Sequence, residues 1–181
     1  MSSPTPTSRD SRGTAPDAPG EASGEPLRLE TFLPYRLSIL SEVVSRSLSR
    51  IYADRFGIAI PEWRVVATIG QFGRVTARDV GAHSHMHKTK VSRAVAALEG
   101  LGYVARSPNP QDMRESFLEL TPRGEAMYRE LVPQARAFSD ALLATLPPEA
   151  QKELDSLLTR LQDAARRLGG AETDSAPEAS G

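Results

Sequence analysis

Residues 88–101 constrain the fold most strongly, because their side chains separate into two faces of a helix. At about 100° per residue, one face is an apolar stripe made of Val91, Ala94, Val95, Leu98 and Leu101. The other face carries small residues around one arginine, with a lysine on each flank: Lys88, Thr89, Lys90, Ser92, Arg93 and Ala96. Such a face can approach a polyanion closely, and the major groove of duplex DNA admits a helix. The segment therefore predicts a DNA-recognition helix.

The segments on either side predict a helix-turn-helix followed by a β-hairpin. Thr76 and Asp79 form a capping-box pair that starts a short helix ending near Ala82. A turn over residues 83–87 leads into the recognition helix. Two short strands are expected at 103–106 and 117–120, and the two prolines between them indicate a long loop. This order is that of a winged helix-turn-helix, spanning residues 61–121.

Long amphipathic helices are expected on both sides of this module. They are predicted at 33–56, at 61–71 and, after a cap at Thr121, at 122–146 and 149–168, with a kink at Pro133. Helices 33–56 and 122–168 carry more apolar surface than so small a core can absorb, which predicts a homodimer. A two-fold dimer would place its recognition helices about 34 Å apart, one turn of DNA. The expected fold class is mainly α with a small β-hairpin wing.

Composition limits what else the chain can be. The domain is expected at residues 29–168, between disordered tails at 1–28 and 169–181 that are rich in small and polar residues. The chain has no cysteine, which excludes disulfides and thiolate metal sites. No apolar run could span a membrane, and no basic-then-apolar leader is present, so a cytoplasmic location is expected. No catalytic arrangement or cofactor motif is recognisable, so we expect neither an enzyme nor a bound cofactor.

The formal net charge of −1 hides a local excess of positive charge. Residues 62–123 contain nine lysines and arginines against six aspartates and glutamates. A basic region inside an acidic chain is an electrostatic pattern typical of nucleic-acid binding.

The chain resembles the MarR (multiple antibiotic resistance regulator) family of transcription factors over residues 30–168. The resemblance is carried by PEWRVVATIG, by HKTKVSRAVAALEGLGYV, by the D-x-R of the loop and by LTPRG. It implies an obligate homodimer that binds a palindromic operator and a small-molecule effector, with Arg114 of the wing entering the minor groove. It also implies that Asp112 positions a nearby arginine and that Arg106 supports the hairpin. A guanidinium at a loop tip is independently suited to a narrow, electronegative minor groove.

Candidate effector-binding residues lie on the first two helices. Arg36, Arg46 and Arg50 lie along one flank of helix 33–56, where they are either solvated or beside a cavity, holding a carboxylate. Trp63 is either a core anchor or a pocket wall. Strings in helix 33–56 and the PEWRV element resemble the family branch that answers aromatic acids such as hydroxycinnamates or their CoA thioesters.

Two alternatives remain open at this stage. The family often has an acidic residue where this chain has His87, and His83, His85 and His87 stand two apart. They could cap the helix, contact phosphate or form the metal site of a metal-responsive regulator, although metal ligands usually converge from separate elements. The winged helix could also be a protein-interaction module, but an apolar or acidic outward face would then be expected.

Overall fold

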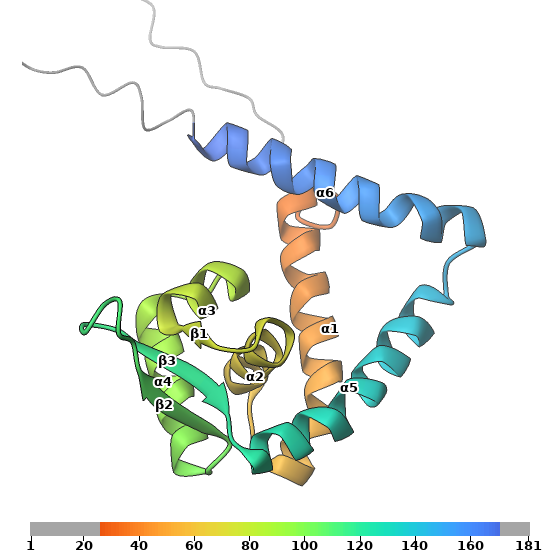
Figure 1. Cartoon of the computed structure of the whole chain (residues 1–181). Helices are drawn as coiled ribbons and strands as arrows, with labels where there is room; N and C mark the ends of the chain where they lie inside the picture. Colours follow the sequence, from red (N-terminus) through yellow and green to blue (C-terminus); the bar gives the residue numbers. More distant parts are fainter. Residues whose placement is uncertain (1–25, 171–181) are drawn as a thin grey trace, which may run out of the picture. The chain divides into compact units, whose positions relative to one another are not determined.

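The computed structural model describes residues 26–170, so most of the predicted tails, 1–28 and 169–181, lies outside the described residues. Residues 169–170, predicted as tail, form the end of helix α6. Helices and strands follow one another in the order shown in Figure 1: α1 (Leu33–Phe56), α2 (Ile60–Phe72), β1 (Val75–Thr76), α3 (Ala77–Ser84), α4 (Lys88–Gly100), β2 (Val104–Pro108), β3 (Ser116–Leu120), α5 (Pro122–Leu143) and α6 (Pro148–Gly170). The predicted fold class, mainly α with a small β-sheet, is confirmed. None of the described helices has the length and apolarity needed to cross a membrane.

The chain falls into two units, one ending at Ile39 and the other beginning at Leu40, and α1 runs through the boundary. In the first unit, the carbonyl oxygen of Arg28 accepts hydrogen bonds from the backbone N–H groups of Thr31 (3.2 Å) and Phe32 (3.1 Å). This turn leads into α1, whose first turn contains Pro34, a position where the missing N–H costs nothing. The second unit contains the remaining helices and the sheet.

The sheet has three antiparallel strands in the order β1–β3–β2. Leu118 of β3 pairs with Val75 on one side and with Arg106 on the other. The β2–β3 hairpin and the loop that extends beyond the end of the sheet (Figure 1) form the wing, residues 104–120. Strand β1 was not predicted, because two residues are too few to show an alternating pattern.

The core lies inside the winged helix and is built from the inward faces of its elements. Its largest fully buried side chains are Tyr52, Ile58, Val65, Val66, Val80, Val91, Val95, Leu98, Leu118 and Leu131. These come from α1, the α1–α2 connection, α2, α3, α4, β3 and α5, so the core joins the helix-turn-helix and the sheet to α1 and α5. Burial of this apolar surface is the main favourable term in folding.

Several element boundaries differ from those predicted. Leu101 is 36% exposed rather than part of the apolar stripe. Helix α4 ends at Gly100, and the chain turns at Gly102, whose φ of 74° suits a residue without a Cβ. The short helix α3 reaches Ser84 rather than ending near Ala82, and α5 ends at Leu143 rather than at residue 146. Tyr103 precedes β2 and is buried.

Candidate nucleic-acid interface

Helix α4 presents one face to the core and the other to solvent. Val91, Ala94, Val95 and Leu98 are buried. The opposite residues are exposed, and they are the residues singled out from the sequence: Lys88, Thr89, Lys90, Ser92, Arg93 and Ala96. Since the apolar face is held in the core, the helix cannot rotate without exposing it. The polar face therefore has a defined orientation towards any bound partner.

Three histidines surround the start of this helix, and each has a different surrounding. The ring of His83 stacks on Phe72, with centroids 4.1 Å apart. His85 takes a left-handed conformation (φ 52°) at the end of α3. His87 is the N-cap of α4, and its Nδ1 accepts a hydrogen bond from the backbone N–H of Thr89 at 3.4 Å. Within residues 26–169, no three His, Cys, Asp or Glu side chains gather as a possible metal site.

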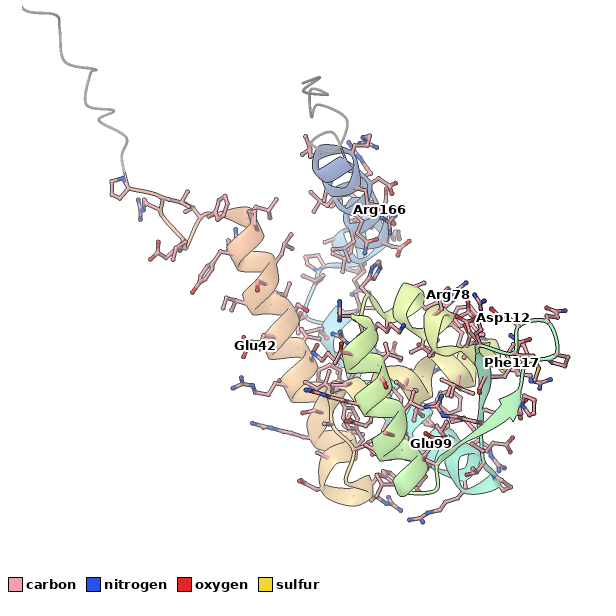
Figure 2. The ribbon with its side chains drawn as sticks, turned by 90° about the vertical axis from the view of Figure 1, so that its left-hand side faces the viewer. Glu42, Arg78, Glu99, Asp112, Phe117 and Arg166 are labelled. Carbon is pink, nitrogen blue, oxygen red and sulfur yellow. The ribbon has the colours of Figure 1, made fainter. Side chains whose placement is uncertain are left out.

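The wing loop is held by side-chain-to-backbone hydrogen bonds. The buried Asn109 accepts from the N–H groups of Gln111 (3.0 Å) and Asp112 (3.3 Å) through Oδ1. Oδ1 of Asp112 in turn accepts from the N–H of Arg114 at 2.9 Å. Asp112, which Figure 2 labels in this loop, thus contacts the backbone of Arg114, whereas the family resemblance implied a role in orienting an arginine. Aspartate commonly bonds the N–H two residues onward. The bonds leave the Arg114 side chain exposed.

Arg106 connects the wing to the recognition helix. Its Nε lies 2.9 Å from Oε1 of Glu99, near the C-terminal end of α4 (Figure 2). This contact joins β2 to α4, and the role of Arg106 in supporting the hairpin stays a prediction.

Ion pairs divide the basic residues into two groups. Arg74, Arg78 and Arg106 pair with Glu119 (2.8 Å), Glu115 (2.8 Å) and Glu99 (2.9 Å). By contrast, five exposed cations within residues 62–123 have no ion pair among the described residues: Lys88, Lys90, Arg93, Arg114 and Arg123. Arg123 lies over the ring of Tyr103, and the other four lie on α4 and the wing loop. Sequence counting could not separate these groups, because each pair joins different secondary-structure elements whose packing the sequence alone does not give.

A hollow of about 490 Å³ lies between α3, α4 and the wing. Its polar lining is mainly basic, and it includes Arg78, Lys88, Ser92, Arg106, Arg114 and Glu115. Lysine, arginine and serine side chains are common phosphate contacts in protein–DNA complexes. The hollow can thus accept a negatively charged backbone between the recognition helix and the wing.

The candidate effector residues are placed differently. Trp63 stacks on Tyr52, with ring centroids 5.4 Å apart, and the buried Tyr52 hydroxyl has no hydrogen-bond partner within the described chain. Burial raises the pKa of Tyr52 to about 12, because the ionised form would lose its hydration. The hollow that Trp63 lines contains Arg64 and none of the three predicted arginines. Sequence analysis missed Tyr52, because a single tyrosine beside an apolar stripe carries no distinctive signal.

The three predicted arginines are all exposed. Arg46 pairs with Glu42 one turn earlier on α1 (Figure 2), and Arg50 lies further along the same helix. Arg36 belongs to the unit that ends at Ile39.

Comparisons with known proteins agree with this geometry. Residues 58–116 match the family model described as "MarR family". The chain is 26% identical to the HTH-type transcriptional regulator FarR of Neisseria gonorrhoeae over 108 residues, 60% of this chain and 74% of FarR. The crystal structure of a probable transcriptional regulator from Pseudomonas aeruginosa is 25% identical with a TM-score of 0.63, covering 74% of this chain and 99% of that one.

A further solved structure shares the fold at lower identity. It concerns regulation of DNA binding of Bordetella bronchiseptica BpsR by 6-hydroxynicotinic acid; it is 20% identical with a TM-score of 0.68, covering 77% of this chain and 99% of BpsR.

Proposed function

Because this chain belongs to the MarR family of winged helix-turn-helix transcription regulators, we propose that it is a homodimeric repressor of a palindromic operator, released by a small aromatic acid. Members of this family regulate transcription by binding DNA and are not enzymes, so these two parts follow from the family. The repressor role, the dimer and the effector class are the proposed parts.

The exposed face of α4 is the observation that carries the DNA-binding proposal. Arg93 stands at its centre without an ion pair and can bridge O6 and N7 of guanine in the major groove. Lys88 and Lys90 flank it and fit phosphate contacts, which add affinity without sequence information. Thr89 and Ser92 are short enough to let the helix approach the base edges.

The wing supplies the second contact in this proposal. Arg114 is exposed at the wing loop, and its backbone is held by Asp112. A guanidinium in this position is attracted to a minor groove that is narrow and therefore strongly negative. The basic hollow between α4 and the wing would then hold the sugar-phosphate backbone that separates the major groove from the minor groove.

Exposed apolar residues on three helices support the dimer. They are Leu33, Leu37, Ile39, Leu40 and Val43 on α1, Leu142 on α5, and Leu157, Leu158, Leu161 and Leu168 on α6. Exposed large apolar residues in this number commonly mark a protein interface. A second copy of the chain would cover it and would set the spacing of two recognition helices at about 34 Å.

An aromatic acid is proposed as the effector on the basis of Trp63 and Tyr52. Trp63 is half-buried and lines a hollow, where its ring can stack on an aromatic ligand, and the buried Tyr52 packs against it. Arg64 lines the hollow beside Trp63 and could pair with a carboxylate, and Arg36, Arg46 and Arg50 remain proposed ligands in the assembled dimer. An effector that favours the released state by about 1–3 kcal/mol changes operator affinity roughly 5–150-fold.

Selection from random duplex DNA tests the proposal directly. The purified full chain should enrich a palindrome whose half-sites are centred about 10 base pairs apart at physiological salt. Adding 6-hydroxynicotinate or a hydroxycinnamate should weaken binding to that duplex, with benzyl alcohol as a control that lacks the carboxylate. Failure to enrich any sequence would contradict DNA regulation, whereas enrichment without an effect of aromatic acids would contradict only the effector class.

A further inference from the structure

We propose that Arg74 is the positioning residue of the wing, orienting the hairpin so that Arg114 reaches the minor groove while Arg74 itself does not touch DNA. This inference rests on the proposed function for its DNA-binding consequence. It assigns a role to a basic residue that charge counting alone would place among the DNA contacts.

Arg74 contacts both strands of the hairpin from outside it. It follows Gly73, whose positive φ of 75° turns the chain at the end of α2. The guanidinium pairs with Glu119 on β3 at 2.8 Å and lies over the ring of Phe117, 4.3 Å from its centroid. It also donates to Oγ of Ser107 (3.0 Å) and to the carbonyl oxygen of Pro108 (3.3 Å) on β2.

These contacts gather at the root of the wing loop. Ser107 is paired with Phe117, and Pro108 with Ser116. Arg74 therefore contacts the last residue pairs before the two strands separate. Figure 2 labels Phe117 in the strand and Asp112 in the loop beyond it. The hydrogen bonds of Asn109 and Asp112 give the loop a fixed internal shape. Because the loop has a fixed internal shape, its orientation depends on the residue pairs from which it starts, and Arg74 contacts those pairs.

A role in overall stability does not account for this arrangement. The side chains of Arg74 and Glu119 are 48% and 45% exposed, and exposed ion pairs contribute little to folding. The arginine uses its planar, multiply donating head to reach four groups on two strands, a geometry that lysine cannot reproduce. What the contacts constrain is the angle of the hairpin relative to the end of α2.

Arg74 is also separate from the surface that would meet DNA. It lines a different hollow from the one between α4 and the wing, together with Glu119, Tyr128 and Arg129. Arg78 makes a comparable ion pair with Glu115 of the wing, but it does line the DNA-facing hollow. Loss of Arg78 would therefore mix positioning with phosphate contact, whereas loss of Arg74 isolates positioning.

A double-mutant cycle tests the proposal with the duplex that the wild-type chain selects. Arg114→Ala alone should weaken binding about tenfold or more, the range expected for a good arginine contact. In the Arg74→Ala background, the same change should weaken binding by no more than about twofold, because Arg114 is already misplaced. Arg93→Ala should cost the same factor in both backgrounds, since α4 is held by the core. Equal Arg114→Ala factors in the two backgrounds would overturn the proposal.

Glu119→Gln is a second test, because the charge change and the loss of positioning have opposite effects on DNA binding. It removes one negative charge from the protein, so charge alone would tighten DNA binding. Positioning predicts instead that the contribution of Arg114 falls, as in Arg74→Ala. Arg166→Ala removes a similarly exposed ion pair with Asp163 on α6 and is the matched control, which should leave the Arg114→Ala factor unchanged.

Amide hydrogen exchange of the free protein separates this inference from the proposed function. Arg74→Ala should accelerate exchange in residues 104–120 and leave α4 unchanged, whether or not any duplex is bound. If the wild type selects no DNA, the proposed function fails, and unaltered exchange in the wing would overturn the positioning role independently.

Discussion

Gly124, in the first turn of α5, packs directly against the backbone carbonyl of Tyr103, and a Cβ at this position would overlap that oxygen. The same carbonyl accepts a hydrogen bond from the N–H of Thr121 at 3.0 Å. The Thr121 hydroxyl donates to the carbonyl of Gly102 (2.7 Å) and accepts from the N–H of Gly124 (3.0 Å). The L-T-x-x-G motif therefore locks the start of α5 onto the connection between α4 and β2.

Gly124→Ala should lower the free energy of unfolding by about 1–3 kcal/mol, because the added methyl group meets backbone rather than a movable side chain. Urea denaturation of the purified protein measures this. Gly100→Ala is the matched control: the space around Gly100 is open, and alanine favours the helix, so stability should rise by up to about 1 kcal/mol. A neutral Gly124→Ala would contradict the packing argument.

Arg93→Ala should weaken binding to the selected duplex by about 1–3 kcal/mol and relax the preference for guanine at one position. Lys88→Ala and Lys90→Ala should weaken all sequences alike and reduce the salt dependence by about one counterion each. Fluorescence anisotropy titrations at several salt concentrations, against matched and single-base-changed duplexes, distinguish these effects. An unchanged base preference in Arg93→Ala would show that another residue reads the sequence.

Leu161→Glu should weaken the proposed homodimer by at least about tenfold, because an unpaired charge would be buried where the apolar face of α6 meets the second copy. Sedimentation velocity over a concentration series measures the monomer–dimer equilibrium. Thr159→Glu introduces the same charge away from the leucines and should leave the equilibrium unchanged. If both variants remain dimeric, the interface lies elsewhere.

Asp79 should stabilise the protein at neutral pH and lose this effect in acid. Its pKa is lowered mainly by hydrogen bonds from the backbone N–H and the hydroxyl of Thr76; burial opposes this shift, and His83 and Arg78 add smaller lowering effects. A carboxyl whose folded pKa is below its unfolded value contributes stability above the unfolded pKa of about 3.8 and loses it as pH falls through the folded value. The stability difference between wild type and Asp79→Asn should therefore shrink between pH 5 and pH 2, at roughly the pH range of carboxyl titration. Thermal unfolding of both proteins across that pH range measures this. A stability difference that stays constant with pH would show that the Asp79 cap plays no part.

Local sequence patterns anticipated the helices and their ends well. Helix α1 has the predicted bounds, and Thr76 and Thr121 are the predicted N-caps. The exposed face of α4 was predicted because helical periodicity depends only on neighbours within a few residues. The MarR resemblance, carried by short motifs, likewise follows from the order of residues.

Contacts between distant residues could not be anticipated in the same way. Arg78 pairs with Glu115 of the wing, and Trp63 of α2 stacks on Tyr52 of α1. Strand β1 exists only because β3 pairs with it.

The amino-acid sequence by itself determined the helices, their caps and which side of α4 is polar, because these depend on interactions within one or two helical turns. Only the tertiary structure decided which arginines are free to meet DNA. Arg74 and Glu119 are far apart along the chain, and their pairing depends on the fold that brings the end of α2 against β3. Charge is a property of each residue, but its availability to a partner is a property of the packed chain.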